Sequence, residues 1–192
     1  MLPLPLLPLI ILAAMTTVSC HDNREKATPK PQAYHRISIP DSVYISYNTG
    51  TADLMVNADA VIADSIRQDG RWIDISYPHF PGAKIFLTLT STTPSALPAL
   101  IENRTERIRL NTSSATTEVT ELTSVGGWSG TLFMTRNSLT TPLQILAYNP
   151  DHTGLLSGAL YISPSPSATP DSIAPIVSAV SHDLLTTLKN LK

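Results

Sequence analysis

Apolar and polar residues alternate with a period of two at more than one place in the chain, a pattern typical of half-buried β-strands. The clearest example is 72–77 (WIDISY), where the alternation places both isoleucines and Tyr77 on one face. A turn-rich break at 78–82 (PHFPG) and a second strand pattern at 83–89 (AKIFLTL) predict a hairpin. Shorter strand patterns precede it at 34–39, 43–47 and 60–66.

Two segments show helical spacing instead. From Leu97 to Asn111 the apolar residues share one face, with Ser95 as the expected cap and Pro98 in the first turn. The strongest periodic signal is an apolar stripe near the end of the chain, formed by Ile173, Ile176, Val177, Val180, Leu184, Leu188 and Leu191. This stripe predicts a helix packed on the core, with His182 and Asp183 on its polar side.

Between these helices, strand patterns are expected at 118–124, 128–135, 143–148 and 155–162. Strands, one helix, more strands and a closing helix indicate an α+β fold, in which an antiparallel sheet is packed with two main helices. The chain has no internal repeat and no second long hydrophobic segment, so we expect a single α+β domain over residues 33–192.

The N-terminal segment has a different pattern. Residues 2–14 (LPLPLLPLIILAA) are apolar and uncharged, and small residues lead from there to Cys20 and a polar stretch. This is typical of a secretory signal peptide and is short for a membrane span. A cysteine after the small Ser19 resembles a bacterial lipobox. We therefore predict a lipoprotein signal peptide over 1–19, lipidation of Cys20, with palmitate as an expected acyl group, and a tether over 20–32.

An ordinary signal peptide followed by a buried free thiol is the alternative. No Lys or Arg precedes the apolar run, and Thr17 stands where a lipobox usually has Leu. In favour of lipidation, Cys20 is the only cysteine, so an exported chain cannot use it in an internal disulfide.

Charge and composition exclude some classes of function. The 13 Lys and Arg residues and the 15 Asp and Glu residues give a net charge of -2, and no basic stripe is present. This argues against a nucleic-acid partner. The chain also has no phosphate-binding loop and no dinucleotide fingerprint, so no cofactor is expected.

Catalytic motifs are sparse. The nearest match to a serine-hydrolase elbow is 126–130 (GGWSG), but Thr131 stands where the second glycine belongs. A strand is also expected after Ser129, whereas the elbow needs a helix. His152 lies in a turn of Asn, Pro and Gly residues, so we interpret it as part of a solvated loop.

Metal-binding motifs are equally sparse. The histidines are isolated, no HExxH motif exists, and cysteine ligands are absent from the expected domain. Asp59, Asp64 and Asp69 recur every five residues, which places no pair on a common face. We interpret them as solvated carboxylates, with a calcium site as the less favoured alternative.

Aromatic residues concentrate in the N-terminal half of the chain. Core and sheet-edge packing is the favoured interpretation, and a partner-binding surface is the alternative. The residues concerned are Tyr34, Tyr44, Tyr47, Trp72, Tyr77 and Phe80.

Residues 29–40 (PKPQAYHRISIP) resemble the start of the mature part of a known family, the gliding motility lipoprotein GldD family. Residues 72–78 with 83–89 are similar to its central hairpin. Residues 157–162 (SGALYI) followed by 170–177 (PDSIAPIV) are similar to its C-terminal end. The likeness spans about residues 27–192 in the family's order.

Two departures indicate a divergent member. Ser157 stands where the family usually has Arg, and 107–110 (RIRL) replaces a basic and aromatic run. The resemblance implies a Bacteroidetes lipoprotein associated with gliding motility and with the type IX secretion machinery, without known catalysis. The order of elements also resembles the Mog1/PsbP-like α+β sandwich, which is an analogy of fold alone.

These observations predict a non-enzymatic lipoprotein of the cell envelope. We expect it to be anchored in a membrane, to face the periplasm, and to have other motility or secretion proteins as partners. A periplasmic small-ligand or glycan-binding module is the alternative. An envelope hydrolase using Ser129 or His152 is a third hypothesis.

Overall fold

Nine strands and two helices follow one another in the part of the chain that the computed structural model describes, residues 43–80, 82–112, 116–163 and 168–192. All of these residues belong to one unit, His35–Lys192. The first five strands are joined by short turns: β1 (Tyr44–Asn48), β2 (Asp53–Asn57), β3 (Val61–Arg67), β4 (Gly70–Ser76) and β5 (Ala83–Ser91). β1 and β2 pair as a separate two-stranded sheet.

The remaining elements complete a seven-stranded antiparallel sheet in the order β3-β4-β5-β9-β8-β7-β6. They are α2 (Leu97–Thr112), β6 (Thr117–Thr123), β7 (Ser129–Thr135), β8 (Leu143–Tyr148), β9 (Gly154–Ile162) and α3 (Pro170–Lys189). After β5, α2 carries the chain to the far edge of the sheet, and three hairpins then return it to the centre. There β9 pairs with β5 from Ala83↔Ile162 to Ser91↔Gly154.

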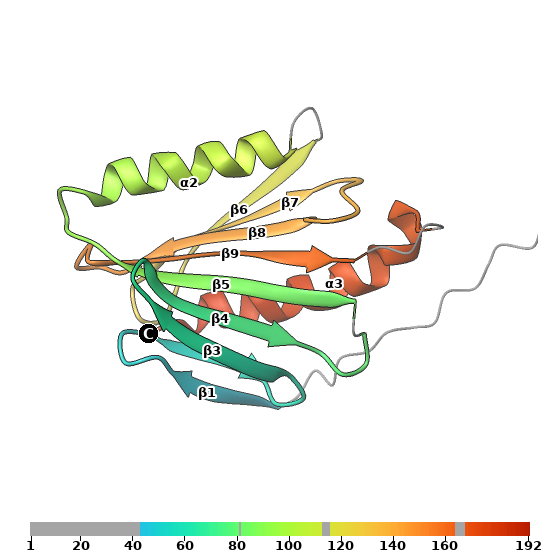
Figure 1. Cartoon of the computed structure of the whole chain (residues 1–192), viewed down its shortest axis with the longest axis horizontal. Coiled ribbons are helices and arrows are strands. Elements are labelled where there is room, and N and C mark those ends of the chain that lie inside the picture. The colour runs from blue at the N-terminus through green and yellow to red at the C-terminus, as the bar shows by residue number, and fades with distance from the viewer. Residues whose placement is uncertain (1–42, 81, 113–115, 164–167) are drawn as a thin grey trace, which may run out of the picture. The chain divides into compact units, whose positions relative to one another are not determined.

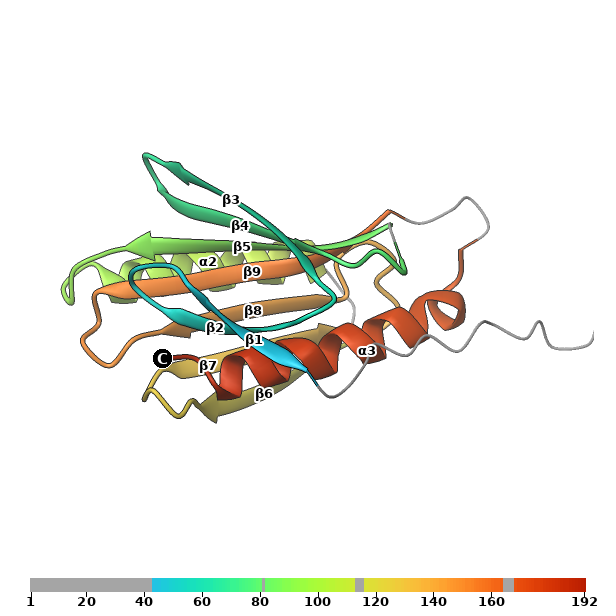
Figure 2. The same cartoon turned by 90° about the horizontal axis from the view of Figure 1, so that it is seen from below.

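Different elements pack on the two faces of this sheet. Figures 1 and 2 show α3 and the β1–β2 hairpin on one face, called here the inner face, and α2 on the opposite, outer face. The alternation in β5 follows this arrangement, because Ile85 and Leu87 are buried inward while Lys84 and Phe86 are exposed on the outer side. One strand therefore contributes to two different surfaces.

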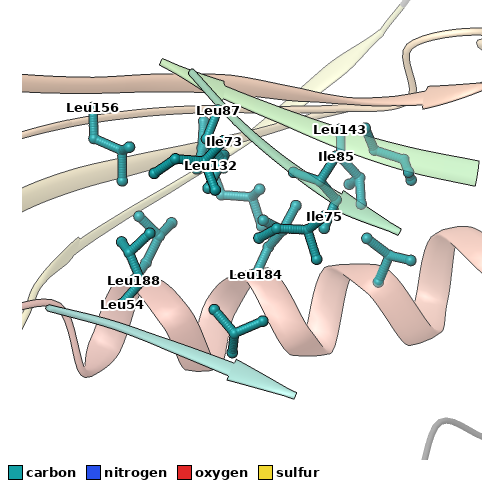
Figure 3. Close-up of a cluster of buried hydrophobic side chains, with 14 of the residues drawn as sticks. Leu54, Ile73, Ile75, Ile85, Leu87, Leu132, Leu143, Leu156, Leu184 and Leu188 are labelled. Atoms are coloured by element: carbon teal, nitrogen blue, oxygen red, sulfur yellow. The ribbon is translucent and has the colours of Figure 1, made fainter. Parts of the chain in front are cut away.

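The main hydrophobic core fills the space between the inner face and α3 (Figure 3). Its largest fully buried side chains come from β2, from five strands of the large sheet and from α3. They include Leu54, Ile73, Ile85, Leu87, Leu132, Ile145, Leu160, Leu184 and Leu188. Each such side chain stabilises the fold by roughly 1.5–3 kcal/mol before entropy costs.

Local chemistry explains where α3 begins and ends. Thr169 forms a capping box with Ser172, and Pro170 occupies the first turn, where its missing N–H is not needed. Asp171 in the first turn and Lys189 in the last both complement the helix dipole. The predicted stripe is confirmed as far as Leu188.

Leu191 lies beyond the end of α3 and is nevertheless buried. The C-terminal residues run beside β2, since Asp53 and Lys192 exchange backbone hydrogen bonds of 2.8 and 3.2 Å. The hydroxyl of Ser124 also donates to the carbonyl of Leu191 at 2.7 Å. Leu191 therefore closes the core through strand-like contacts and not as part of the helical stripe.

The predicted α+β fold is confirmed, as are the hairpin of β4 and β5 and the inward position of Ile73, Ile75 and Tyr77. Ser95 is not the cap of α2, because the hydroxyl of Thr93 accepts from the Ala96 amide at 3.3 Å. The strand β2 was not predicted, and it is the pairing partner of β1. The predicted strand at 34–39 lies outside the described residues.

Gly158 gives a physical reason for part of the sequence pattern at 157–162. A Cβ atom at this position would lie 2.4 Å from Leu87 Cδ2 and 2.7 Å from the Phe86 carbonyl oxygen. β9 and β5 therefore fit together at the centre of the sheet because residue 158 has no side chain.

Candidate functional site

The predicted lipidation site, Cys20, lies outside the described residues, as do the signal peptide and the tether. Among the described helices, none is long and apolar enough to span a bilayer.

The two candidate hydrolase residues lie near each other but are not connected. Ser129 begins β7 opposite Tyr148 of β8, and the ring of His152 lies edge-on to the Tyr148 ring at 5.4 Å. His152 adopts a left-handed backbone with φ of 59° in the β8–β9 turn. Within the described residues, no hydrogen bond joins Ser129 to His152 or either side chain to a carboxylate, so the geometry pairs no nucleophile with a base.

The three regularly spaced aspartates do not converge. Asp64 lies on exposed strand β3, where it accepts hydrogen bonds from Tyr47 and Arg71. These bonds, from Tyr47 first and Arg71 second, hold the pKa of the Asp64 carboxyl below its usual value. Asp69 instead accepts from the indole N–H of Trp72 at 3.1 Å. In the described ranges, no three His, Cys, Asp or Glu side chains gather as a metal site.

Asp183 is placed differently from the prediction. It was expected on the polar side of the last helix, but it is only 4% exposed. Tyr44 and Tyr77 donate to its two carboxylate oxygens at 2.7 and 2.8 Å. Burial, followed by the charge of Asp183 and its hydrogen bond, raises the pKa of the Tyr77 phenol. This cluster ties β1 and the end of β4 to α3.

The aromatic residues divide between core and surface. Tyr77 and Phe80 are buried and stack with ring centroids 4.8 Å apart. Trp72 lies on the outer face of β4, where the Arg67 guanidinium covers its ring at 4.4 Å. Core packing is therefore confirmed for only part of the predicted set.

An exposed aromatic pair was missed at the sequence level. Phe86 of β5 and Tyr161 of β9 lie on the outer face with ring centroids 6.3 Å apart, and they are 38% and 45% exposed. The alternation of β5 contains the signal, because it places Phe86 opposite to Ile85 and Leu87. The outer face around this pair is the candidate functional surface of the domain, since core packing does not account for its composition.

α2 covers only part of that face. Leu97 packs with Leu146 and Leu155 in a small cluster, and Leu100 and Ile101 lie against it only partly buried. The predicted apolar face of the helix is confirmed, but most of the remaining helix is in contact with solvent. α2 is thus a thin cover of the sheet, with cavities beside it.

The model of the family described as gliding motility lipoprotein GldD matches residues 24–192. The chain belongs to the GldD family. A search of curated proteins finds no match.

The GldD match includes all eleven elements described above and continues N-terminally to Arg24. It confirms the resemblance inferred from the succession of short motifs. Membership identifies a gliding motility lipoprotein, and a lipoprotein is associated with the cell envelope.

Proposed function

We propose that this GldD-family protein is an accessory component of the gliding-motility and type IX secretion machinery, without catalysis of its own. The observation that carries the proposal is the family match over residues 24–192. The acylated Cys20 anchors the chain, residues 20–32 form the tether, and the domain over 33–192 faces the periplasm. Other envelope proteins of motility or secretion are its partners.

The geometry of the described residues supports a non-catalytic role. Ser129 and His152 do not form a nucleophile–base pair. Asp183 is occupied by two phenol groups of the same domain. The outer face carries the exposed aromatic rings of Phe86 and Tyr161, which suit binding better than bond cleavage.

A deletion strain tests the function. We expect loss of type IX cargo from the culture fluid and loss of spreading on agar, both restored by the wild-type gene. The Cys20→Ala variant should fail to restore either phenotype, because the domain then lacks its anchor. Ser19→Ala is the matched control, since it keeps a small residue before the cysteine and should restore both phenotypes.

The anchor is tested separately by labelling cells with radioactive palmitate. Wild type and Ser19→Ala should carry the label and sediment with membranes, whereas Cys20→Ala should not.

The domain should resist protease in intact cells and become sensitive when the outer membrane is opened. Unchanged cargo release and spreading in the deletion strain would contradict the proposed role and favour the ligand-binding alternative.

A further inference from the structure

Three buried polar side-chain atoms have no hydrogen-bond partner in the described part of the chain. They are Thr90 Oγ1 on β5, Arg104 Nε on α2 and Gln144 Nε2 on β8. The strand alternation places Thr90 and Gln144 on the outer face, which is the face that α2 crosses (Figure 1). Buried donors are rarely left unpaired, because each unmade hydrogen bond costs stability. Arg104 belongs to this helix and Gln144 lies on the sheet face that the helix crosses, so these two unpaired donors point to a missing acceptor between them.

Two of the three atoms belong to residues that line one cavity between α2 and the sheet. Its volume is about 200 Å³, and its polar lining consists of Thr88, Arg104, Arg107, Gln144 and Ser157. Gln144 is only 4% exposed. The lining thus combines two guanidinium groups, a carboxamide and two hydroxyls, and it contains no carboxylate.

Both positive charges of the cavity lining come from α2. Arg104 and Arg107 lie three residues apart on α2, which places them on neighbouring positions of one helical face. Neither forms a salt bridge within the described residues. Arg67 has none there either, and its guanidinium covers the Trp72 ring. The remaining described arginines have acidic partners: Arg71 with Asp64, Arg109 with Glu106, and Arg136 with Glu118.

A carboxylate does occur elsewhere on the outer face. Asp74 of β4 lies opposite Phe86 in the strand register. It does not line the cavity, whereas Phe86 does. Among the described residues, the positive charge of Arg104 and Arg107 is therefore balanced neither by a carboxylate in the cavity lining nor by an ion pair.

We propose that this cavity binds an oxyanion, the phosphate or carboxylate group of a small ligand. Guanidinium groups recognise both anions through charge-assisted hydrogen bonds, often two at a time. The Arg104 Nε and Gln144 Nε2 donors supply further bonds from the two sides of the cavity, and the Thr88 and Ser157 hydroxyls can donate from the sheet. Phe86 and Ala159 give the cavity an apolar side for the rest of the ligand.

Calorimetric titration of the full chain in a non-ionic detergent tests this site. The probes are inorganic phosphate, glycerol 3-phosphate and acetate, with glycerol as the neutral control. We expect the wild type to bind at least one anion and not glycerol, with binding weakened by added sodium chloride. The double variant R104Q/R107Q should bind about tenfold more weakly or worse, because it loses two charged donors.

Arg109→Gln is the matched control, because this residue lies on the same helix, is paired with Glu106 and does not line the cavity. Its affinity for the anion should equal that of the wild type.

Gln144→Leu removes the buried amide at similar volume, and it should weaken anion binding while the melting temperature is kept or raised. Each Arg variant is checked for an unchanged melting temperature.

The preferred probe identifies the source of the anion. Tighter binding of glycerol 3-phosphate than of inorganic phosphate assigns a phosphate monoester, such as a lipid headgroup, and the reverse assigns free phosphate. Tightest binding of acetate assigns a carboxylate. The proposal is overturned if no anion binds, or if R104Q/R107Q and Arg109→Gln lose the same affinity.

Discussion

The two faces of the seven-stranded sheet are built from the same strands but have different physical characters. The inner face meets α3 and the β1–β2 hairpin through a continuous core of aliphatic side chains. The outer face meets only α2, and its buried hydrophobic cluster consists of Leu97, Leu146 and Leu155. Exposed aromatic rings and buried polar atoms without partners are found on the outer side.

This difference assigns most of the stability of the fold to the inner face and the capacity for binding to the outer face. A face that is filled with aliphatic side chains contributes most of the favourable free energy of folding. A thinly covered face contributes less and can keep polar groups in position for a partner. The following substitutions test this separation, beginning with the largest expected effect.

Leu184→Ala should lower the free energy of unfolding by about 2–5 kcal/mol, because it leaves a cavity in the inner core. Leu100→Ala on α2 is the matched outer-face substitution and should cost about 1 kcal/mol, because this side chain is only partly buried. Urea denaturation followed by circular dichroism measures both values. Equal losses of the free energy of unfolding in the two variants would show that both faces contribute equally to stability.

Gly158→Ala should destabilise the sheet by about 1–3 kcal/mol, because the added methyl group overlaps Leu87 and the Phe86 carbonyl. Gly154→Ala on the same strand is the control. Its Cβ would meet its nearest neighbours at 3.5 Å, an ordinary contact distance. Melting temperatures compare the two variants, and a tolerated Gly158→Ala would contradict the tight fit of β9 on β5.

Tyr77→Phe should cost about 1–3 kcal/mol, because it removes a buried hydrogen bond to the Asp183 carboxylate. Tyr161→Phe is the exposed control and should have no measurable effect. Denaturation at neutral pH distinguishes the two variants. An unaffected Tyr77→Phe would show that the cluster around Asp183 does not hold the helix.

The same cluster should make stability sensitive to alkali. The pKa of Tyr77 is raised in the folded state above its ordinary value of 10.0. The contribution of the Tyr77 phenol to the free energy of unfolding is therefore complete below pH 10. It is lost above that pH, because Tyr77 then ionises in the unfolded chain. Tyr77→Phe should lose less stability than the wild type between pH 10 and 11.

Asp64→Asn should have the smallest effect, because the carboxylate lies on the exposed strand β3. The pKa of Asp64 is lowered below its ordinary value of 3.8, so its contribution is present above that pH and is lost as pH falls towards the folded value. The variant and the wild type should differ near neutral pH and converge under acid conditions. Asp59→Asn is the control, and an equal effect of both substitutions would contradict the role of the Tyr47 and Arg71 contacts.

The sequence predicted the elements whose own periodicity is strong. The alternation at 72–77 and the helical spacing after Asp171 both survive in β4 and α3. β2 was missed because its five residues lie between two loop-like stretches, although Leu54 and Val56 alternate as a strand should. Short elements of this kind are defined by their neighbours more than by their own pattern.

The contacts of Asp183 and the cavity under α2 could not be predicted from the periodicity of the sequence, because they join residues that lie far apart along the chain. Asp183 lies three residues after Val180 and one before Leu184, at the border of the apolar stripe, and only the fold brings Tyr44 and Tyr77 to it. Likewise, the cavity under α2 combines residues from one helix and three strands, which no local pattern connects. The family, by contrast, could be predicted, because its motifs recur in order along the chain.

Hydrogen–deuterium exchange of the full chain tests the contrast between the faces most directly. Amides of α3 and of the central strands β5 and β9 should exchange only through global unfolding, because the inner core must open to release them. Amides of α2 should exchange faster, through local opening that leaves the sheet intact. Equal protection of α2 and α3 would contradict the account, since the outer layer would then be as firmly held as the inner core.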